Sequence, residues 1–325
     1  MLKVGMIGMG GISRAHRGGW AKIDEAEVVA VCDIRRENAD EAAKELGARA
    51  YYDFDAMLAA EEMDILDICL PTYLHADYAV KALEHGLHVL MEKPVSLKRE
   101  DVARVYGAAK AAGKNVMVAQ VLRFWREYTA LKEAYDSGRY GRLLSGRMTR
   151  LGSTPKWSWD GWMRDPERSG LVPFDLHIHD LDFMIYAFGA PAGVSCHRAG
   201  NERQDYFEAI YQYPDFFISA EAAWFDCDYA FQSAYRFQFE RAVMEYQGSK
   251  LTIYHQSGER ETLADEADAP ENGINLPSSN GYYNEIRYFV DCVLAGKPCD
   301  RVKPEELETV LDLIDSLTQD SSGNS

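Results

Sequence analysis

Apolar runs and amphipathic segments alternate along the first 121 residues of the chain. The apolar runs, each short enough for a buried strand, lie at 3–8, 28–32, 50–52, 64–69, 88–91 and 115–121. The pattern predicts helices between them, at 14–23, 40–46, 54–60, 76–85 and 99–112. Strands separated by helices predict a parallel sheet with right-handed crossovers, whose ligand binds at the carboxyl ends of the strands.

The second half of the chain has a different pattern. Its short runs are rich in Val, Ile, Phe and Tyr and are separated by turn signals such as Pro214-Asp215 and Gln247-Gly248. These runs lie at 144–150, 194–197, 206–213, 216–225, 234–239, 242–247 and 250–255. They predict an antiparallel meander, with one face packed on helices and the other free to pair with a second subunit.

The last part of the chain returns to helical patterns. Helices are predicted at 282–294 and 305–317. The acidic stretch 261–281 is predicted to be a long loop and a candidate flap, and the polar tail 319–325 is expected to be disordered.

Composition narrows the class of partner. The chain has 325 residues, 47% of them hydrophobic and 27% charged, which is typical of a folded protein of two domains. A net charge of -17 repels phosphate backbones and anionic lipids, so we expect a small-molecule partner and neither nucleic acid nor membrane. No run approaches the roughly 20 apolar residues of a membrane span, and the start runs directly into a strand, so we expect a cytoplasmic protein. The six cysteines include no C-x-x-C pair and are expected to be free structural thiols.

A glycine-rich turn follows the first predicted strand. In Gly8-x-Gly10-Gly11, the first glycine allows a tight turn and the second lets the backbone approach a pyrophosphate, while the next helix offers free N–H groups. The second strand ends in Asp33, whose carboxylate suits the two ribose hydroxyls of NAD and repels the 2′-phosphate of NADP. Arg35 and Arg36 leave NADP open, because they could cradle that phosphate or be solvated residues at a helix start. NAD is the predicted cofactor.

Two later strands end in polar motifs. Pro71-Thr72-x-x-His75 follows the fourth strand, and Glu92-Lys93-Pro94 follows the fifth. A cation at the position of Lys93 could face the nicotinamide of a bound dinucleotide, which points to hydride chemistry on a hydroxyl or ketone.

A second motif, at 169–182, contains Asp175, His177 and His179. On a helix, Asp175 and His179 share one face, where a carboxylate and a base can reach one substrate edge, and His177 points elsewhere. Histidines two residues apart diverge on a helix, so no metal is expected.

Other candidates remain ambiguous. Tryptophans at 157, 159 and 162 precede the second motif, and either bind a sugar face or pack a domain edge. The remaining histidines, which match no motif, are predicted to be surface or helix-end residues: His16, His85, His88, His197 and His255.

Together these motifs resemble the Gfo/Idh/MocA family of nicotinamide-dependent oxidoreductases, which is named for glucose-fructose oxidoreductase and inositol dehydrogenase. The resemblance implies an α/β protein with an N-terminal Rossmann domain and a C-terminal α/β domain built on a large, mostly antiparallel open sheet. It places the dinucleotide-binding domain at 1–122 and a substrate-binding and oligomerisation domain at 123–325. It also implies a sugar or cyclitol substrate, and homodimers or homotetramers formed through the C-terminal sheet.

Roles carry over from the family to matching positions of this chain. Lys93 would contact substrate and nicotinamide, Asp175 would bind a substrate hydroxyl, and His179 would take the hydroxyl proton. His177 stands where the family has glycine, so it would narrow the pocket or add a substrate contact. The cofactor-binding candidates are Gly8, Gly10, Gly11, Ile12, Asp33, Ile34, Pro71, Thr72, His75, Glu92, Lys93 and Gln120. The substrate-binding candidates are Lys93, Trp162, Asp175, His177 and His179.

The predicted function is hydride transfer between a hydroxyl carbon of a sugar or cyclitol and a nicotinamide, with Lys93, Asp175 and His179 as catalytic residues. Three alternatives stay open. One is an NAD-dependent glycosidase that oxidises its substrate transiently, the second is a non-catalytic dinucleotide sensor, and the third is a reductase of an imine or enone.

Overall fold

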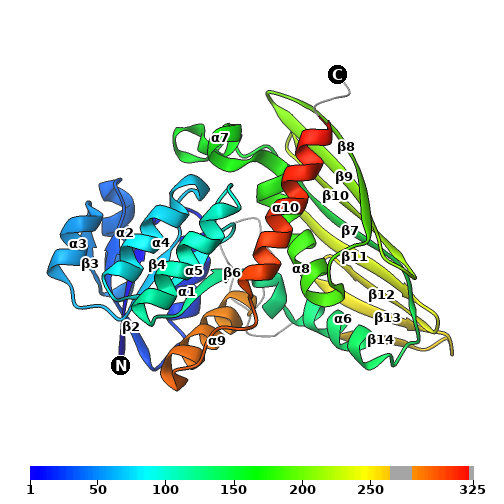
Figure 1. Ribbon diagram of the computed structural model, residues 1–325, viewed down its shortest axis with the longest axis horizontal. Coiled ribbons are helices and arrows are strands. Elements are labelled where there is room, and N and C mark those ends of the chain that lie inside the picture. The colour runs from blue at the N-terminus through cyan, green and yellow to red at the C-terminus, as the bar shows by residue number, and fades with distance from the viewer. Residues whose placement is uncertain (264–279, 322–325) are drawn as a thin grey trace. The chain divides into compact units, whose positions relative to one another are not determined.

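The chain forms two compact units in the computed structural model, which describes residues 1–263 and 280–321 (Figure 1). Within those residues, unit 1 consists of 1–121 and 280–307, and unit 2 consists of 122–263 and 308–321. The chain therefore leaves unit 1 after residue 121, returns to it late, and leaves it again after residue 307. The predicted loop at 261–281 and the predicted tail lie mostly outside the described residues.

Unit 1 is built on a six-stranded sheet of order β3-β2-β1-β4-β5-β6, in which all pairs are parallel. Its strands are β1 Leu2–Ile7, β2 Ala26–Cys32, β3 Arg49–Tyr51, β4 Ile65–Ile68, β5 His88–Glu92 and β6 Val116–Ala119. Its helices are α1 Ser13–Trp20, α2 Arg36–Leu46, α3 Phe54–Ala60, the 3₁₀ turn Thr72–Leu74, α4 His75–Glu84, α5 Glu100–Ala112 and α9 Gly281–Ala295. The predicted parallel sheet is confirmed, because strands covered on both faces read as continuous apolar runs.

The last strand of unit 1 is shorter than its apolar run predicts. The run extends to residue 121, but β6 ends at Ala119 and a 3₁₀ turn follows at Val121–Phe124. The chain crosses from unit 1 to unit 2 within this turn. Apolar residues therefore continue beyond the strand because the turn is itself buried.

Helix α9 packs on α1, far from it in sequence. Gly19 makes this possible, since a Cβ there would lie 2.5 Å from Ile286 Cδ1. At the same contact, the ring centroids of His16 and Tyr282 are 5.8 Å apart, and Arg287 Nη1 lies 2.6 Å from Glu25 Oε2. This segment therefore completes the packing of unit 1.

Unit 2 is built on an eight-stranded sheet of order β14-β13-β12-β11-β7-β10-β9-β8. Its strands are β7 Leu143–Ser153, β8 Gly193–Asn201, β9 Gln204–Gln212, β10 Phe217–Phe225, β11 Gln232–Phe239, β12 Ala242–Gln247, β13 Lys250–His255 and β14 Arg260–Leu263. All neighbours are antiparallel except β7 and β10, which confirms the predicted mostly antiparallel sheet.

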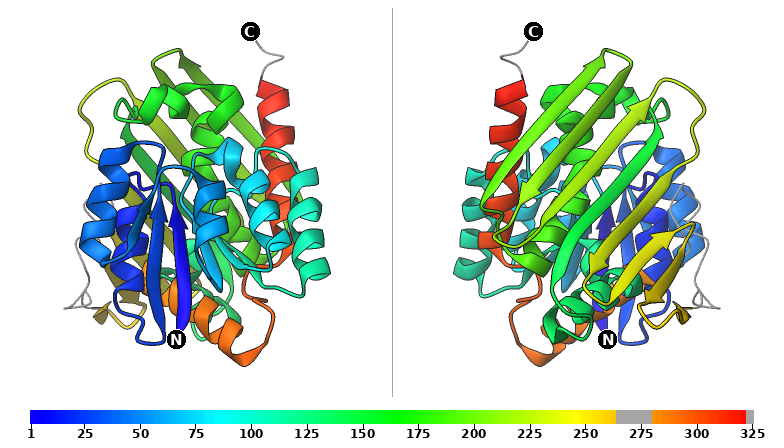
Figure 2. Two further views of the ribbon diagram at one scale, coloured as in Figure 1. Left: turned by 90° about the vertical axis from the view of Figure 1, so that its left-hand side faces the viewer. Right: turned by 90° about the vertical axis from the view of Figure 1, so that its right-hand side faces the viewer.

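The helical segments of unit 2 are α6 Arg126–Ser137, the 3₁₀ segment Trp159–Arg164, α7 Pro166–Ser169, a π-helical turn Pro173–His177 and α8 Ile178–Phe188. Helix α10, Pro304–Ser321, begins in unit 1 and continues in unit 2. Within unit 2, α6, α8 and the later part of α10 lie on one face of the sheet, and the described residues place no helix on its other face (Figure 2).

Alternation along the strands explains this one-sided packing. On β9, Phe207, Ala209 and Tyr211 are buried, while the intervening side chains are more exposed. Two large apolar residues stand out on exposed positions of the sheet, Ile210 on β9 and Phe217 on β10. In residues 1–263 and 280–321, no helix has the length and apolar character that crossing a membrane requires.

Candidate functional site

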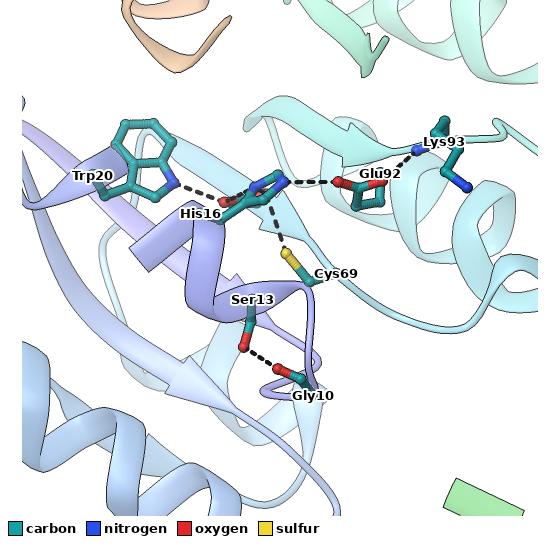
Figure 3. Close-up of polar contacts among 8 residues, drawn as sticks. Gly10, Ser13, His16, Trp20, Cys69, Glu92 and Lys93 are labelled. Carbon is teal, nitrogen blue, oxygen red and sulfur yellow. Dashed lines mark hydrogen bonds and ion pairs between the residues drawn. The ribbon is translucent and has the colours of Figure 1, made fainter. Parts of the chain in front are cut away.

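The glycine-rich turn of unit 1 is shaped to approach a ligand closely. Gly8 has φ of 83°, and a Cβ there would lie 2.6 Å from Cys69 O, so no side chain fits. Ser13 Oγ donates to Gly10 O at 2.7 Å, which holds the turn against α1 (Figure 3). No side chain caps the start of α1 at Ile12. The N–H groups of Arg14 and Ala15 already donate to Gly11 O and Ile12 O, so the main-chain N–H groups that could meet a phosphate are those at residues 11–13.

Asp33, at the end of β2, braces this turn. Its Oδ2 accepts from Met9 N at 2.9 Å and its Oδ1 accepts from Arg35 N at 2.7 Å. The side chain of Arg35 stays beside it, with Nε 3.5 Å from Oδ1. The Arg36 guanidinium lies 4.0 Å from the ring centre of Tyr52 and is thus engaged elsewhere. Of the two predicted arginines, only Arg35 stands next to the Asp33 carboxylate.

Two further cofactor candidates follow strands of the same sheet. Ile34, directly after Asp33, is a large apolar side chain with 68% of its surface exposed. Gln120 follows β6 and is buried, and its main-chain N–H donates to Val118 O at 2.9 Å. Both stay candidates by position at the carboxyl ends of strands.

His75 joins two strand-end loops. Its Nδ1 lies 2.6 Å from Pro94 O, and its Nε2 lies 2.7 Å from Leu70 O. The residue is 1% exposed, and burial lowers its pKa. Because both ring nitrogens contact main-chain oxygens, His75 ties the loop after β4 to the loop after β5. His75 thus supports both loops, and its contact with the cofactor stays a prediction; Thr72, also buried, belongs to the same turn.

Lys93 directly follows Glu92, which belongs to a buried polar network that the sequence pattern did not reveal. His16 is fully buried on α1 and lies between two carboxylates (Figure 3). Its Nδ1 is 2.9 Å from Asp67 Oδ2, and its Nε2 is 3.0 Å from Glu92 Oε1. The main-chain N–H of Lys93 donates to Glu92 Oε2 at 3.0 Å. His16 is therefore not the surface or helix-end residue that was predicted.

Two more side chains complete this network. Trp20 Nε1 donates to Asp67 Oδ2 at 2.7 Å, and Cys69 Sγ lies 3.8 Å from Asp67 Oδ1. His16, Asp67 and Cys69 are close enough to one another to surround a metal ion. However, burial and the charge of Asp67 raise the pKa of Cys69 to about 12, and a metal requires the thiolate. The cluster therefore fits a hydrogen-bonded network better than a metal centre.

In unit 2, Asp175 and His179 occupy the accessible stripe of an otherwise buried helical segment. From Val172 to Ile185, these two residues alone are not buried. The segment starts as a π-helical turn, with Ile178 N bonded to Pro173 O, and becomes α-helical at residue 178. Such turns carry one extra residue and are frequent at functional sites. The predicted face thus exists, although the helix is not regular through Asp175.

His177 points into the core of unit 2. It is fully buried, its Nε2 lies 2.6 Å from Tyr211 Oη, and its ring packs 4.6 Å from that of Phe207. Burial and the nearby Arg150 lower the pKa of His177 to about 3. The predicted substrate contact is corrected, since this imidazole faces the sheet and not the accessible stripe.

Two buried ion pairs hold the helix that carries His179. Arg123 bonds both carboxylate oxygens of Asp182, at 2.8 and 2.6 Å, and Arg150 Nη2 lies 2.8 Å from Asp180 Oδ1. Charged residues within an apolar helical run are a sequence signal that could have revealed these pairs. They fix α8 against the sheet and against the turn at residues 121–124.

The tryptophan segment is mostly accessible. Trp157 is 68% exposed and Trp159 is 41% exposed, which argues against a role in packing a domain edge. Trp162 is partly buried within the 3₁₀ segment. Arg168 Nη1 lies 3.0 Å from Asp160 Oδ2 and fastens this segment to α7.

Comparison with known proteins places both halves of the chain. A model described as "Oxidoreductase family, NAD-binding Rossmann fold" matches residues 2–120, and one described as "GFO/IDH/MocA C-terminal domain" matches residues 128–245. The chain is 32% identical over 196 residues to D-glucoside 3-dehydrogenase of Escherichia coli K12, covering 59% of this chain and 55% of that protein. It is 29% identical over 255 residues to D-apiose dehydrogenase of Paraburkholderia graminis, covering 77% of this chain and 66% of that protein. These matches thus span about half to two thirds of the relatives' length.

A solved structure is similar over the whole chain. It is levoglucosan dehydrogenase in complex with NADH and levoglucosan, with a TM-score of 0.84 and 20% identity, covering 100% of this chain and 98% of the other. At this identity the likeness shows the shared fold of both units.

Proposed function

We propose that this chain, which belongs to the GFO/IDH/MocA family of oxidoreductases with an NAD-binding Rossmann fold, is a dehydrogenase that oxidises a hydroxyl carbon of a sugar or cyclitol. The observation that carries this proposal is the pairing of Asp175 and His179 on the one accessible stripe of a buried helix. A carboxylate and an imidazole one turn apart can bind adjacent hydroxyls of one ring.

The turn at residues 8–13 fits a dinucleotide. Gly8 lets the turn pack against the main chain after β4, Gly10 leaves the turn open to a phosphate, and Asp33 offers a carboxylate to a ribose. Bound there, the nicotinamide would supply the acceptor for the hydride that leaves the hydroxyl carbon. We propose NAD rather than NADP because a carboxylate repels a 2′-phosphate.

The chain's own residues would accept the proton of the substrate hydroxyl and stabilise charge on its oxygen. His179 accepts the hydroxyl proton, a role that suits an imidazole near neutral pH. Lys93 would hydrogen-bond a substrate oxygen and stabilise negative charge that develops on it. Asp175 binds a neighbouring hydroxyl and keeps the ring in register, since a displacement of about 1 Å can cost about a hundredfold in rate.

The substrate class follows from the relatives and from the aromatic segment. The two curated relatives are named for a glucoside and for apiose, both sugars. The partly buried Trp162 offers an aromatic face of the kind that packs on a sugar ring. We therefore include Trp162 among the proposed substrate contacts and leave His177 out.

The test is a screen for reduced nicotinamide with NAD and NADP across inositols, aldoses, ketoses and glycosides. On the best substrate, Lys93→Ala and His179→Ala should each lower kcat by about 100-fold or more while NAD binding persists. The exposed His197 of β8 provides the matched control, and His197→Ala should keep normal turnover. Normal turnover in Lys93→Ala or His179→Ala would contradict the assignment. Release of a glycone without reduced nicotinamide would instead indicate transient oxidation.

We also propose that two or more copies associate through the helix-free face of the sheet of unit 2. Ile210 and Phe217 place exposed apolar surface on adjacent strands of that sheet. Light scattering should give the mass of a dimer or tetramer, and Phe217→Glu should shift it towards the monomer. A monomeric wild-type protein would contradict this proposal.

A further inference from the structure

The network around His16 places charge where an apolar core is expected. Asp67 lies within β4, whose four residues are all buried, and Glu92 closes β5. Asp67 pairs with Leu90 in the parallel ladder, so Asp67 and Glu92 project from the same face of the sheet. Helix α1 covers this face with the His16 ring, which is fully buried.

The hydrogen bonds determine the protonation of His16. Ionised carboxylates only accept, so an imidazole that bonds one carboxylate at each nitrogen carries a proton on both. Burial acts to lower the pKa of His16, but the charge of Asp67 and its hydrogen bond hold that pKa well above the ordinary value. Burial acts to raise the pKa of Glu92, but the hydrogen bond and charge of His16 hold it below the ordinary value. The charges of His16 and Glu92 therefore persist at neutral pH.

Stability alone does not account for such a network. Buried ion pairs are costly to desolvate, and well-packed apolar residues in their place are often neutral or stabilising. What the charged groups add is a precise geometry, because each charge-assisted hydrogen bond holds its donor and acceptor at a short distance and within a narrow range of angles. Here the bonds tie α1, which follows the glycine-rich turn, to β4 and to the end of β5. The last bond is made to the main-chain N–H of Lys93.

We propose that His16 is a positioning residue for Lys93 and acts through Glu92. His16 holds one oxygen of Glu92, and the other oxygen then holds the main chain from which the Lys93 side chain starts. This inference rests on the proposed function only in that Lys93 takes part in the reaction. Its structural part, the hold on the Lys93 amide, can be measured without any substrate.

Two amide substitutions separate the two bonds of His16. In His16→Asn, the amide nitrogen reaches the position of Nδ1, so the bond to Asp67 persists and the bond to Glu92 is lost. In His16→Gln, the amide nitrogen reaches the position of Nε2, so the bond to Glu92 persists and Asp67 loses a donor. Both variants remove the same positive charge. His85→Asn, at an exposed histidine after α4, is the control for loss of an imidazole in unit 1.

The first readout is hydrogen exchange at the Lys93 amide in the protein without substrate. We expect slow exchange in the wild type and in His16→Gln, and exchange faster by about tenfold or more in His16→Asn. The second readout is turnover on the substrate found by the screen. His16→Asn should lower kcat by about 10- to 100-fold with KM little changed, because a misplacement of about 1 Å costs about 100-fold. His16→Gln should lose less than about threefold in kcat, yet unfold at lower urea concentration than the wild type, because Asp67 loses one of its donors.

Each outcome decides the matter. If kcat falls equally in both variants, in proportion to lost stability, His16 has a merely structural role and the proposal fails. If the Lys93 amide of the wild type exchanges as fast as an unprotected amide, the proposal fails without any variant. If exchange behaves as expected but no substrate is turned over, the positioning holds and the proposed function fails.

Discussion

His177 should make unit 2 sensitive to acid. Its pKa is lowered to about 3 by burial and by Arg150, whereas a histidine in the unfolded chain has a pKa of about 6.5. Below that ordinary value the unfolded chain binds a proton that folded His177 refuses, so stability falls as the pH falls. Between about pH 7 and pH 5 the linkage relation gives a loss of about 2 kcal/mol. The loss of about 2 kcal/mol depends little on the pKa of His177 in the folded protein, provided that this pKa stays below about 4.

The perturbation is His177→Phe, which keeps a ring beside Phe207 and removes the titrating group. Loss of the bond to Tyr211 should destabilise the variant by about 1–3 kcal/mol at neutral pH. The test measures the free energy of unfolding in urea for both proteins at about pH 7 and at about pH 5, and compares how much each protein loses between the two. The wild type should lose about 2 kcal/mol more than the variant over this interval. His197→Phe, at an exposed position of β8, controls for the removal of an imidazole as such. If wild type and His177→Phe lose equal free energy, His177 does not stay neutral in the folded protein and the reasoning is wrong.

Three further predictions concern other parts of the chain. Gly8→Ala should lower the free energy of unfolding by about 3 kcal/mol and abolish NAD binding, because the new Cβ would lie 2.6 Å from Cys69 O. The control Gly47→Ala, at a φ of 68° with no atom within 4 Å, should cost only about 1 kcal/mol. Equal losses for the two variants in urea unfolding would refute the argument from close approach. Arg123→Met should cost about 3–5 kcal/mol because it removes the buried guanidinium that pairs with Asp182, and the double variant with Asp182→Leu should recover most of that loss. A double variant as unstable as the single one would count against this account. Asp33→Ser should move the ratio of KM values for NADP and NAD by about tenfold or more towards NADP, and an unchanged ratio would show that the carboxylate does not select the cofactor.

Much of unit 1 could be predicted from local patterns. The alternation of apolar runs and helices defines the parallel sheet, and Gly8 and Asp33 follow strands in a way that marks the dinucleotide turn. His16 could not be placed in this way, because its partners Asp67 and Glu92 are 51 and 76 residues away. A histidine near the start of a helix is surface-exposed unless distant carboxylates meet it. The one local hint was a charged residue, Asp67, inside an apolar strand.

The second motif shows a different limit. The spacing of Asp175 and His179 predicts a shared face, and both residues are accessible. The same spacing predicts that His177 points elsewhere, and only the resemblance to the family placed it near the substrate. Its orientation depends on the π-helical turn and on Tyr211 of β9. Periodicity in the sequence does not distinguish a π-helical turn from an α-helical one. Such assignments therefore need the tertiary structure.

The late return of the chain to unit 1 has a consequence for biosynthesis. Helix α9 packs on α1 through Gly19, and Arg287 pairs with Glu25, so the nucleotide-binding half lacks part of its packing until residues beyond 280 have been made. During translation, a nascent chain of 263 residues would already contain the whole eight-stranded sheet but an unfinished N-terminal unit. Unit 2 can thus complete its sheet on the ribosome first, although it is encoded second. A gene fragment that stops after β6 would likewise produce a unit in which the surface of α1 that packs on α9 is exposed.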